Sequence, residues 1–125
     1  MQSLYKTLTK IHRQRKRQLV PTDDLEAHGT VEDWPNPADI PPADANVKVR
    51  DDCDWFAVAC WVDCMAMGLD ANLALCTVDG GGHLVCECQG WIVCNLQTFV
   101  ASRNSLDYEW RKIGRPDEEW YIIVK

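Results

Sequence analysis

One cysteine in this sequence lies between acids at a position where a helix is expected to begin. Cys53 belongs to the stretch DDCDWFAVAC (51–60), with aspartates on both sides. Nearby negative charge raises the pKa of a thiol, whereas the unpaired N–H groups at a helix N-terminus lower it. Those N–H groups can also hydrogen-bond an oxyanion during acyl transfer. Cys53 is therefore a candidate nucleophile, and it needs a base nearby.

His83 is the candidate base, and Asn95 is the candidate group that orients it. His83 follows three glycines at the start of an expected strand, and Gln89-Gly90 is typical of a two-residue hairpin turn before the next strand. If paired residue numbers sum to about 178 or 179, His83 and Asn95 lie at the same open end of the hairpin. We predict that Asn95 holds the His83 ring, as in Cys-His-Asn sites. The structural alternatives are a turn histidine and a hydrogen-bonded asparagine at a strand end.

The elements that must position these residues form a helix followed by strands. Residues 53–67 are apolar on nearly all sides, which predicts a buried helix that Asp51 or Asp52 caps and Gly68 ends. The expected strands are 72–78, 83–88, 91–96, 108–114 and 118–124. A helix followed by antiparallel strands predicts an α+β core over residues 51–125.

The first fifty residues divide into two parts. Residues 1–20 hold six of the thirteen Lys and Arg residues and no acid, and we predict a basic amphipathic helix or arm at 3–19. Such an arm suits a protein partner or a polyanion, although the acidic remainder of the chain opposes nucleic acid. Residues 21–50 are rich in proline and predict an extended segment packed on the core, with Trp34 and Ile40 as anchors.

The order of these motifs resembles the transglutaminase-like cysteine peptidases of bacteria and phages, within the papain-like superfamily. The matching residues are Asp52, Cys53, Asp54, Ala57, Gly68, His83, Trp91 and Asn95, with Trp34 and Pro37 in the upstream stretch EDWPNPADI (32–40). The resemblance implies a transglutaminase-like core, in which a central buried helix packs on an antiparallel sheet. It also implies a thiol protease or acyl transferase that acts on peptide or amide bonds, with Trp34 at the substrate.

The sequence departs from that family at two positions. Asn95 stands where the family has an aspartate, and Trp55 stands where it has a second acid. An inactive member used as a phage or bacterial structural or interaction component, docked through residues 1–20, is therefore the alternative. Some members bind calcium beside the cysteine, but Asp52 and Asp54 alone do not supply six to eight oxygens. We predict no metal and no cofactor.

The number of cysteines and the hydropathy of the sequence indicate the cellular compartment in which we expect the protein. Seven cysteines are an odd number, and no secretory signal is recognisable, so we expect reduced thiols in the cytoplasm or in a virion. Most should be small core residues, namely Cys60, Cys64, Cys76 and Cys94. Zinc is a rival interpretation for His83 with Cys86, Cys88 and Cys94, but these lack the usual knuckle spacing. No apolar run is long enough to cross a membrane, and the sequence does not predict the oligomeric state.

Overall fold

The computed structural model describes residues 3–21, 35–116, 118 and 120–122, so the predicted substrate residue Trp34 lies outside the described residues. Two α-helices, α1 (Leu4–Gln18) and α3 (Cys53–Ala66), accompany two sheets. The strands are β1 (Leu19–Pro21), β2 (Val49–Asp51), β3 (Ala71–Val78), β4 (Gly81–Cys88), β5 (Trp91–Val93), β6 (Ala101–Ser102), β7 (Glu109–Gly114) and β8 (Tyr121–Ile122). Short 3-10 turns cover Pro37–Asp39 and Arg103–Ser105.

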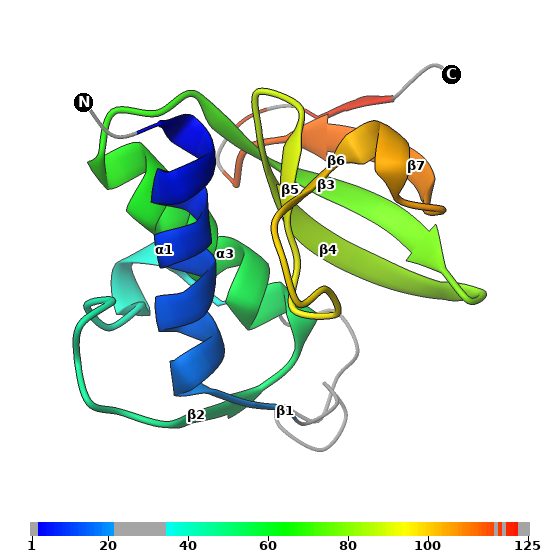
Figure 1. The fold of residues 1–125 in the computed structure, drawn as a ribbon. Coiled ribbons are helices and arrows are strands. Elements are labelled where there is room, and N and C mark those ends of the chain that lie inside the picture. Colours follow the sequence, from blue (N-terminus) through cyan, green and yellow to red (C-terminus); the bar gives the residue numbers. More distant parts are fainter. Residues whose placement is uncertain (1–2, 22–34, 117, 119, 123–125) are drawn as a thin grey trace.

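Helix α3 is the buried central helix that the sequence predicts. The Asp52 side chain caps it by accepting the N–H of Asp54 at 3.0 Å. At the other end Gly68 takes a left-handed φ of +77°, and the N–H of Leu69 donates to the Cys64 carbonyl at 3.0 Å. The helix lies between α1 and the main sheet (Figure 1). Cys53 is thus the first helical residue, as predicted.

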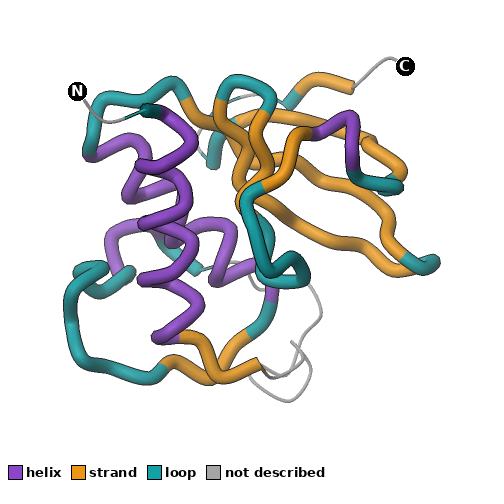
Figure 2. Tube along the Cα trace, viewed as in Figure 1, coloured by secondary structure: helices purple, strands orange, loops and turns teal. Residues whose placement is uncertain are grey.

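The main sheet is antiparallel throughout, in the order β6-β5-β4-β3-β7-β8. Its strands are among the orange segments of Figure 2. Both of its faces are covered. Leu73 and Leu84 face α3 and pack with Ala57 and Val58. The opposite face carries a second cluster of Ala74, Cys76, Val85, Ile92 and Cys94, which Leu106, Tyr108 and Trp110 cover. Successive residues of β4 therefore point alternately to α3 and away from it.

The β4–β5 hairpin has one definite register. Cys88 pairs with Trp91 and Cys86 with Val93, so the paired residue numbers sum to 179. Gln89 and Gly90 have φ values of +53° and +90°, as a primed two-residue turn requires. β5 ends at Val93, whereas the sequence predicted a strand to residue 96. Asn95 consequently lies beyond the strand.

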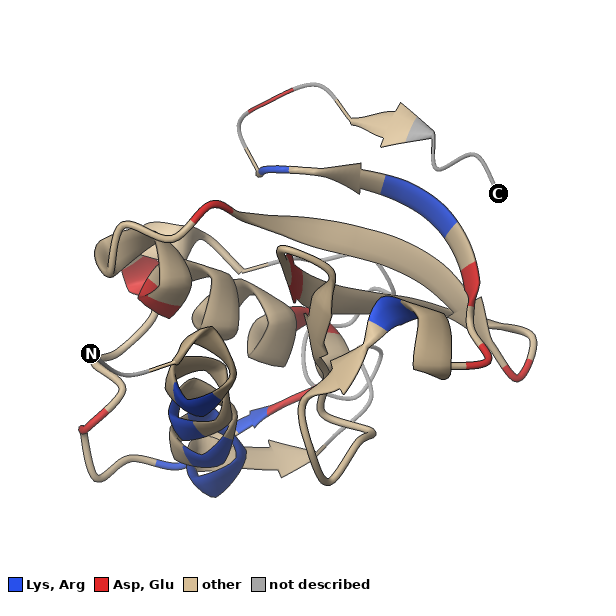
Figure 3. Ribbon diagram, turned by 45° about the horizontal axis from the view of Figure 1, so that its top comes forward, with Lys and Arg blue, Asp and Glu red and all other residues tan. Residues whose placement is uncertain are grey.

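Helix α1 forms part of the core. Leu8 and Ile11 are buried against α3, and Arg15 is only 1% exposed. Arg15 forms a two-pronged ion pair with Asp63 of α3, in which Nε and Nη2 each lie 2.7 Å from a carboxylate oxygen. The other basic residues of the helix face solvent and follow one another along it (Figure 3); they are Lys6, Lys10, Arg13, Lys16 and Arg17.

The segment before α3 is fastened to the core. β1 and β2 form a parallel pair, in which Pro21 is the partner of Asp51 next to the start of α3. Ile40 packs against the core, as predicted. Within the described part of the chain, no helix has the length and apolar character that a bilayer span requires.

Candidate functional site

The thiol of Cys53 lies at the junction of α3 and β4. It donates to Oδ1 of Asp54 at 3.5 Å, and the main-chain N–H of Leu84 donates to its sulfur. Leu84 directly follows His83, so the candidate nucleophile touches the strand that carries the candidate base. Cys53 is half-buried, while the other six cysteines are buried, and all seven are free thiols.

The electrostatics of Cys53 favour the protonated thiol. Burial raises its pKa far above the ordinary value, and the carboxylates of Asp54 and Asp52 raise it further. The hydrogen bond from the N–H of Leu84 lowers the pKa of Cys53, but by less than burial raises it. Cys53 is therefore a neutral thiol at pH 7, and it attacks a carbonyl only if a base removes its proton.

His83 is held by a neighbour that the sequence prediction did not name. Its Nε2 lies 2.9 Å from the sulfur of Cys94. Its ring packs edge-on against Tyr108, with 5.8 Å between the ring centroids. Burial lowers the pKa of His83 from 6.5 to about 4, so the imidazole is neutral at pH 7. The neutral imidazole can accept a proton, but a pKa of about 4 makes it a weak base.

The structure differs from the prediction at Asn95. Because the paired residue numbers sum to 179, Asn95 comes opposite Leu84 and Cys94 comes opposite Val85. Cys94 and Val85 lie on the same sheet face as His83. The side-chain oxygen of Asn95 is buried and has no hydrogen-bond partner among the described residues. No hydrogen bond among the described residues joins Asn95 to His83, or His83 to Cys53. The shift of one residue places a thiol where the amide was expected.

Cys94 has several polar contacts besides His83. The N–H of Leu96 donates to its sulfur at 3.4 Å, and the Tyr108 hydroxyl lies 3.5 Å away. The Gln97 side chain donates to that hydroxyl at 2.9 Å. Burial raises the pKa of Cys94, which keeps it uncharged. The sequence signal for this role was the strict two-residue turn at Gln89-Gly90, which fixes Cys94 on the His83 face.

His12 is the second residue that the sequence analysis missed. It is buried on α1 and packs edge-on against Phe56. Its Nε2 lies 3.0 Å from the carbonyls of both Cys94 and Gln97. Lys16, one turn later, donates to the Asn95 carbonyl at 2.8 Å. Helix α1 therefore fixes the segment that carries Cys94.

The residues around Cys53 do not make a complete metal site within the described part of the chain. Ligand atoms of Asp52, Cys53 and Asp54 lie within 4.8 Å of one another. Two carboxylates and a soft thiol fall short of the six to eight oxygen ligands that calcium takes. The Asp52 side chain also caps α3. Cys86 packs on the α3 side of β4, opposite to His83, so the thiols proposed for zinc do not converge.

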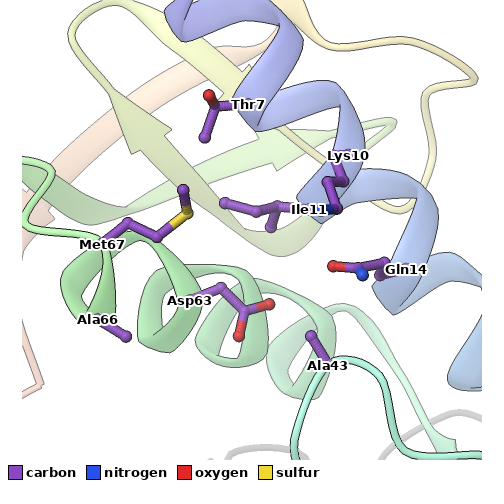
Figure 4. A pocket seen from close by; sticks show the side chains of 8 residues that line it. All are labelled: Thr7, Lys10, Ile11, Gln14, Ala43, Asp63, Ala66 and Met67. Carbon is purple, nitrogen blue, oxygen red and sulfur yellow. The ribbon is translucent and has the colours of Figure 1, made fainter. Parts of the chain in front are cut away.

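A hollow between α1 and α3, of about 260 Å³, does not contain the predicted catalytic residues (Figure 4). Ile11 and Met67 form its apolar side, and Asp63 and Gln14 lie at its polar end. The carboxylate of Asp63 is already paired with Arg15. Lys10 is the other charged residue that lines the hollow.

Solved structures with a similar fold exist. LapG of Legionella pneumophila, treated with EGTA, matches with a TM-score of 0.76 over 99% of this chain and 69% of that chain, at 13% identity. The calcium-bound form of LapG matches at 0.67 over 95% and 74%, at 14% identity. The fold is transglutaminase-like. This confirms the predicted α+β core with a buried helix on an antiparallel sheet. The sequence itself matches no protein-family profile and no curated protein.

Proposed function

We propose that the protein is a small transglutaminase-like cysteine hydrolase that cleaves peptide or amide bonds, with Cys53 as nucleophile and His83 as base. The observation that carries the proposal is the hydrogen bond from the Leu84 N–H to the Cys53 sulfur. This bond brings the thiol next to Leu84, the residue that follows His83. Because Leu84 faces α3 and His83 faces away from it, in this proposal the thiol proton reaches His83 through a water molecule or after a change of side-chain rotamer.

The chemistry follows from the two protonation states. As the sulfur of Cys53 attacks the carbonyl carbon, His83 takes the thiol proton, and the N–H groups at the start of α3 stabilise the oxyanion. His83 then returns the proton to the leaving amine as the C–N bond breaks. Water hydrolyses the thioester in the second half of the reaction. The mechanism uses a neutral thiol and a neutral imidazole, and it needs no preformed ion pair.

In this proposal Cys94 takes the orienting role that the sequence analysis gave to Asn95. Donation from Nε2–H of His83 to the Cys94 sulfur leaves Nδ1 free to accept the Cys53 proton. A thiol stabilises an imidazolium less than a carboxylate does, so we expect slow turnover. The seven free cysteines suit a reducing compartment such as the cytoplasm.

A library of peptides that carry a fluorogenic C-terminal amide tests the proposal. We expect hydrolysis by the wild-type chain, a loss of at least about 100-fold in Cys53→Ser and His83→Ala, and a similar loss in Cys94→Ala. Cys60→Ser, which alters a buried thiol elsewhere on α3, is the matched control and should retain activity. Loss of activity in Asn95→Ala but not in Cys94→Ala would return the orienting role to Asn95. Cleavage that survives Cys53→Ser would exclude Cys53 as the nucleophile.

A second candidate function is a non-catalytic interaction component with the same fold. The observations that favour it are the raised pKa of the Cys53 thiol and the uncharged group beside His83. It predicts no hydrolysis of any library member by the wild-type chain. It also predicts that Cys53→Ala leaves the binding of partners unchanged.

A further inference from the structure

We propose that the groove between α1 and the segment 98–100 is a docking site for an acidic peptide segment of a partner protein, anchored by an apolar side chain. The groove has a volume of about 480 Å³. Its lining residues are Thr9, His12, Arg13, Lys16, Thr98, Phe99 and Val100. The inference concerns a surface outside the proposed catalytic pair and does not depend on catalysis.

The charge of the groove selects an anion. Arg13 and Lys16 are exposed at its edge, and none of the described residues that line it is acidic. Neither cation takes part in an ion pair among the described residues, where Arg15, Arg111 and Arg115 form the recorded pairs. Lys16 has one hydrogen bond, to the carbonyl of Asn95. Both side chains can therefore bind a carboxylate without first breaking an ion pair.

The apolar component comes from the segment after β5. Phe99 is 70% exposed and lines the groove, and Leu96 is 58% exposed three residues earlier. Large exposed apolar side chains beside charged ones are typical of protein-interaction surfaces. An aromatic or aliphatic side chain of the partner would pack on Phe99 while a neighbouring carboxylate meets Arg13 or Lys16. The surface thus matches a peptide that carries both features.

The groove is built in advance of binding. His12 contacts the carbonyls of Cys94 and Gln97, and Lys16 donates to that of Asn95, so α1 is tied to the chain just before residues 98–100. A preformed surface loses little entropy when it binds.

A protein partner fits this surface better than a nucleic acid. Residues 21–125 hold all nineteen acids and only seven of the thirteen Lys and Arg residues. A long polyanion that reached past α1 would meet this negative charge, whereas a short acidic peptide would not. Phe99 and Leu96 also suit a peptide side chain.

Panning a random dodecapeptide display library on the full chain tests the inference. We expect enrichment of peptides that combine Asp or Glu with an aromatic or aliphatic residue. A fluorescein-labelled copy of the most enriched peptide should bind about tenfold more weakly to Arg13→Glu/Lys16→Glu, because two exposed charge contacts become repulsive. Phe99→Ser should also weaken binding. The matched control is Lys6→Glu, a charge reversal on the same helix outside the groove, which should bind like the wild type.

Two further measurements distinguish loss of the groove from loss of catalysis or of folding. Cys53→Ala should bind the peptide as the wild type does, so a failed hydrolase would leave this inference standing. Far-ultraviolet circular dichroism should show the charge-reversed variant to be folded, since both cations are exposed. Enrichment without acidic residues, or equal loss of binding in Lys6→Glu, would overturn the proposal. A third result would indicate a polyanion site and overturn the proposal. In it, no peptide is enriched, a labelled oligothymidine binds tightly to the wild type, and Arg13→Glu/Lys16→Glu abolishes that binding.

Discussion

Nε2 of His83 lies 2.9 Å from the sulfur of Cys94, on the sheet face that Tyr108 covers. This pair puts an uncharged thiol where a base is usually steadied by an amide or a carboxylate. It also explains why the pKa of His83 falls to about 4, since burial is not offset by a negative neighbour. In the proposed mechanism, the basicity of His83 in this pair determines how readily the proton of Cys53 is removed.

A carboxylate at position 94 should restore the charge that this site lacks. In Cys94→Asp, an anion beside Nε2 should raise the pKa of His83 by about one to three pH units, since opposite charges at this distance do so. Proton NMR titration of the His83 ring measures the change. Cys94→Ser, which carries no charge, is the matched control and should leave the pKa low. An equal pKa in Cys94→Asp and Cys94→Ser would contradict the assigned geometry.

Burial of neutral His83 should make the fold less stable in acid. Between about pH 6.5 and 4 the unfolded chain binds a proton on this residue, whereas the folded chain does not. The free energy of unfolding should therefore fall as the pH is lowered through this window, by up to roughly 3 kcal/mol from His83. Urea unfolding at several pH values measures it. His83→Asn should flatten the curve; an unchanged slope would show that His83 titrates normally in the folded chain.

Removal of only one partner of the buried ion pair between α1 and α3 should strongly lower the free energy of unfolding. Arg15→Met leaves Asp63 without its charged partner in a largely dry contact, and we expect a loss of about 3–5 kcal/mol in unfolding free energy. Arg15→Met/Asp63→Leu, which removes both charges, should recover most of it. Denaturant unfolding of the three chains tests this. If the double variant is as unstable as the single one, packing of the Arg15 stem and not charge dominates.

Gly114 should tolerate no side chain, because the Trp120 ring covers it. A Cβ at this position would lie 2.6 Å from Cγ of Trp120. Gly114→Ala should therefore destabilise the fold by about 1–3 kcal/mol through overpacking. Gly82→Ala is the matched control, since nothing lies within 4 Å of a Cβ there. Thermal unfolding that shifts equally in both variants would contradict close packing at Gly114.

The fold was largely predictable because local signals agreed with the tertiary structure. Asp52 as cap, Gly68 as terminator and the apolar surface of residues 53–66 all indicate one buried helix. The two-residue turn at Gln89-Gly90 likewise defines the hairpin. The sequence did not reveal that Arg15 is a core residue, because its partner lies 48 positions away on another helix.

The site was only partly predictable, and the observed position of Asn95 has a simple geometric origin. Sums of 178 and 179 are both compatible with the sequence of the hairpin, but a shift of one residue in the register exchanges the two faces of a strand. At 179, Cys94 shares the His83 face and Asn95 does not. The role of His12 depends on the path of the chain after β5, which carries no periodic pattern in the sequence.

Acylation of the chain by p-nitrophenyl acetate tests the central claim most directly, because this small donor needs no specificity pocket. Cys53 should displace p-nitrophenolate and become acetylated, as shown by peptide mass mapping. The rate should change little between pH 5 and 8, since His83 with a pKa of about 4 stays neutral there, and it should fall about 100-fold in His83→Ala. A rate that rises tenfold with each pH unit, is equal in His83→Ala, or leads to acetylation spread over other cysteines would contradict the account.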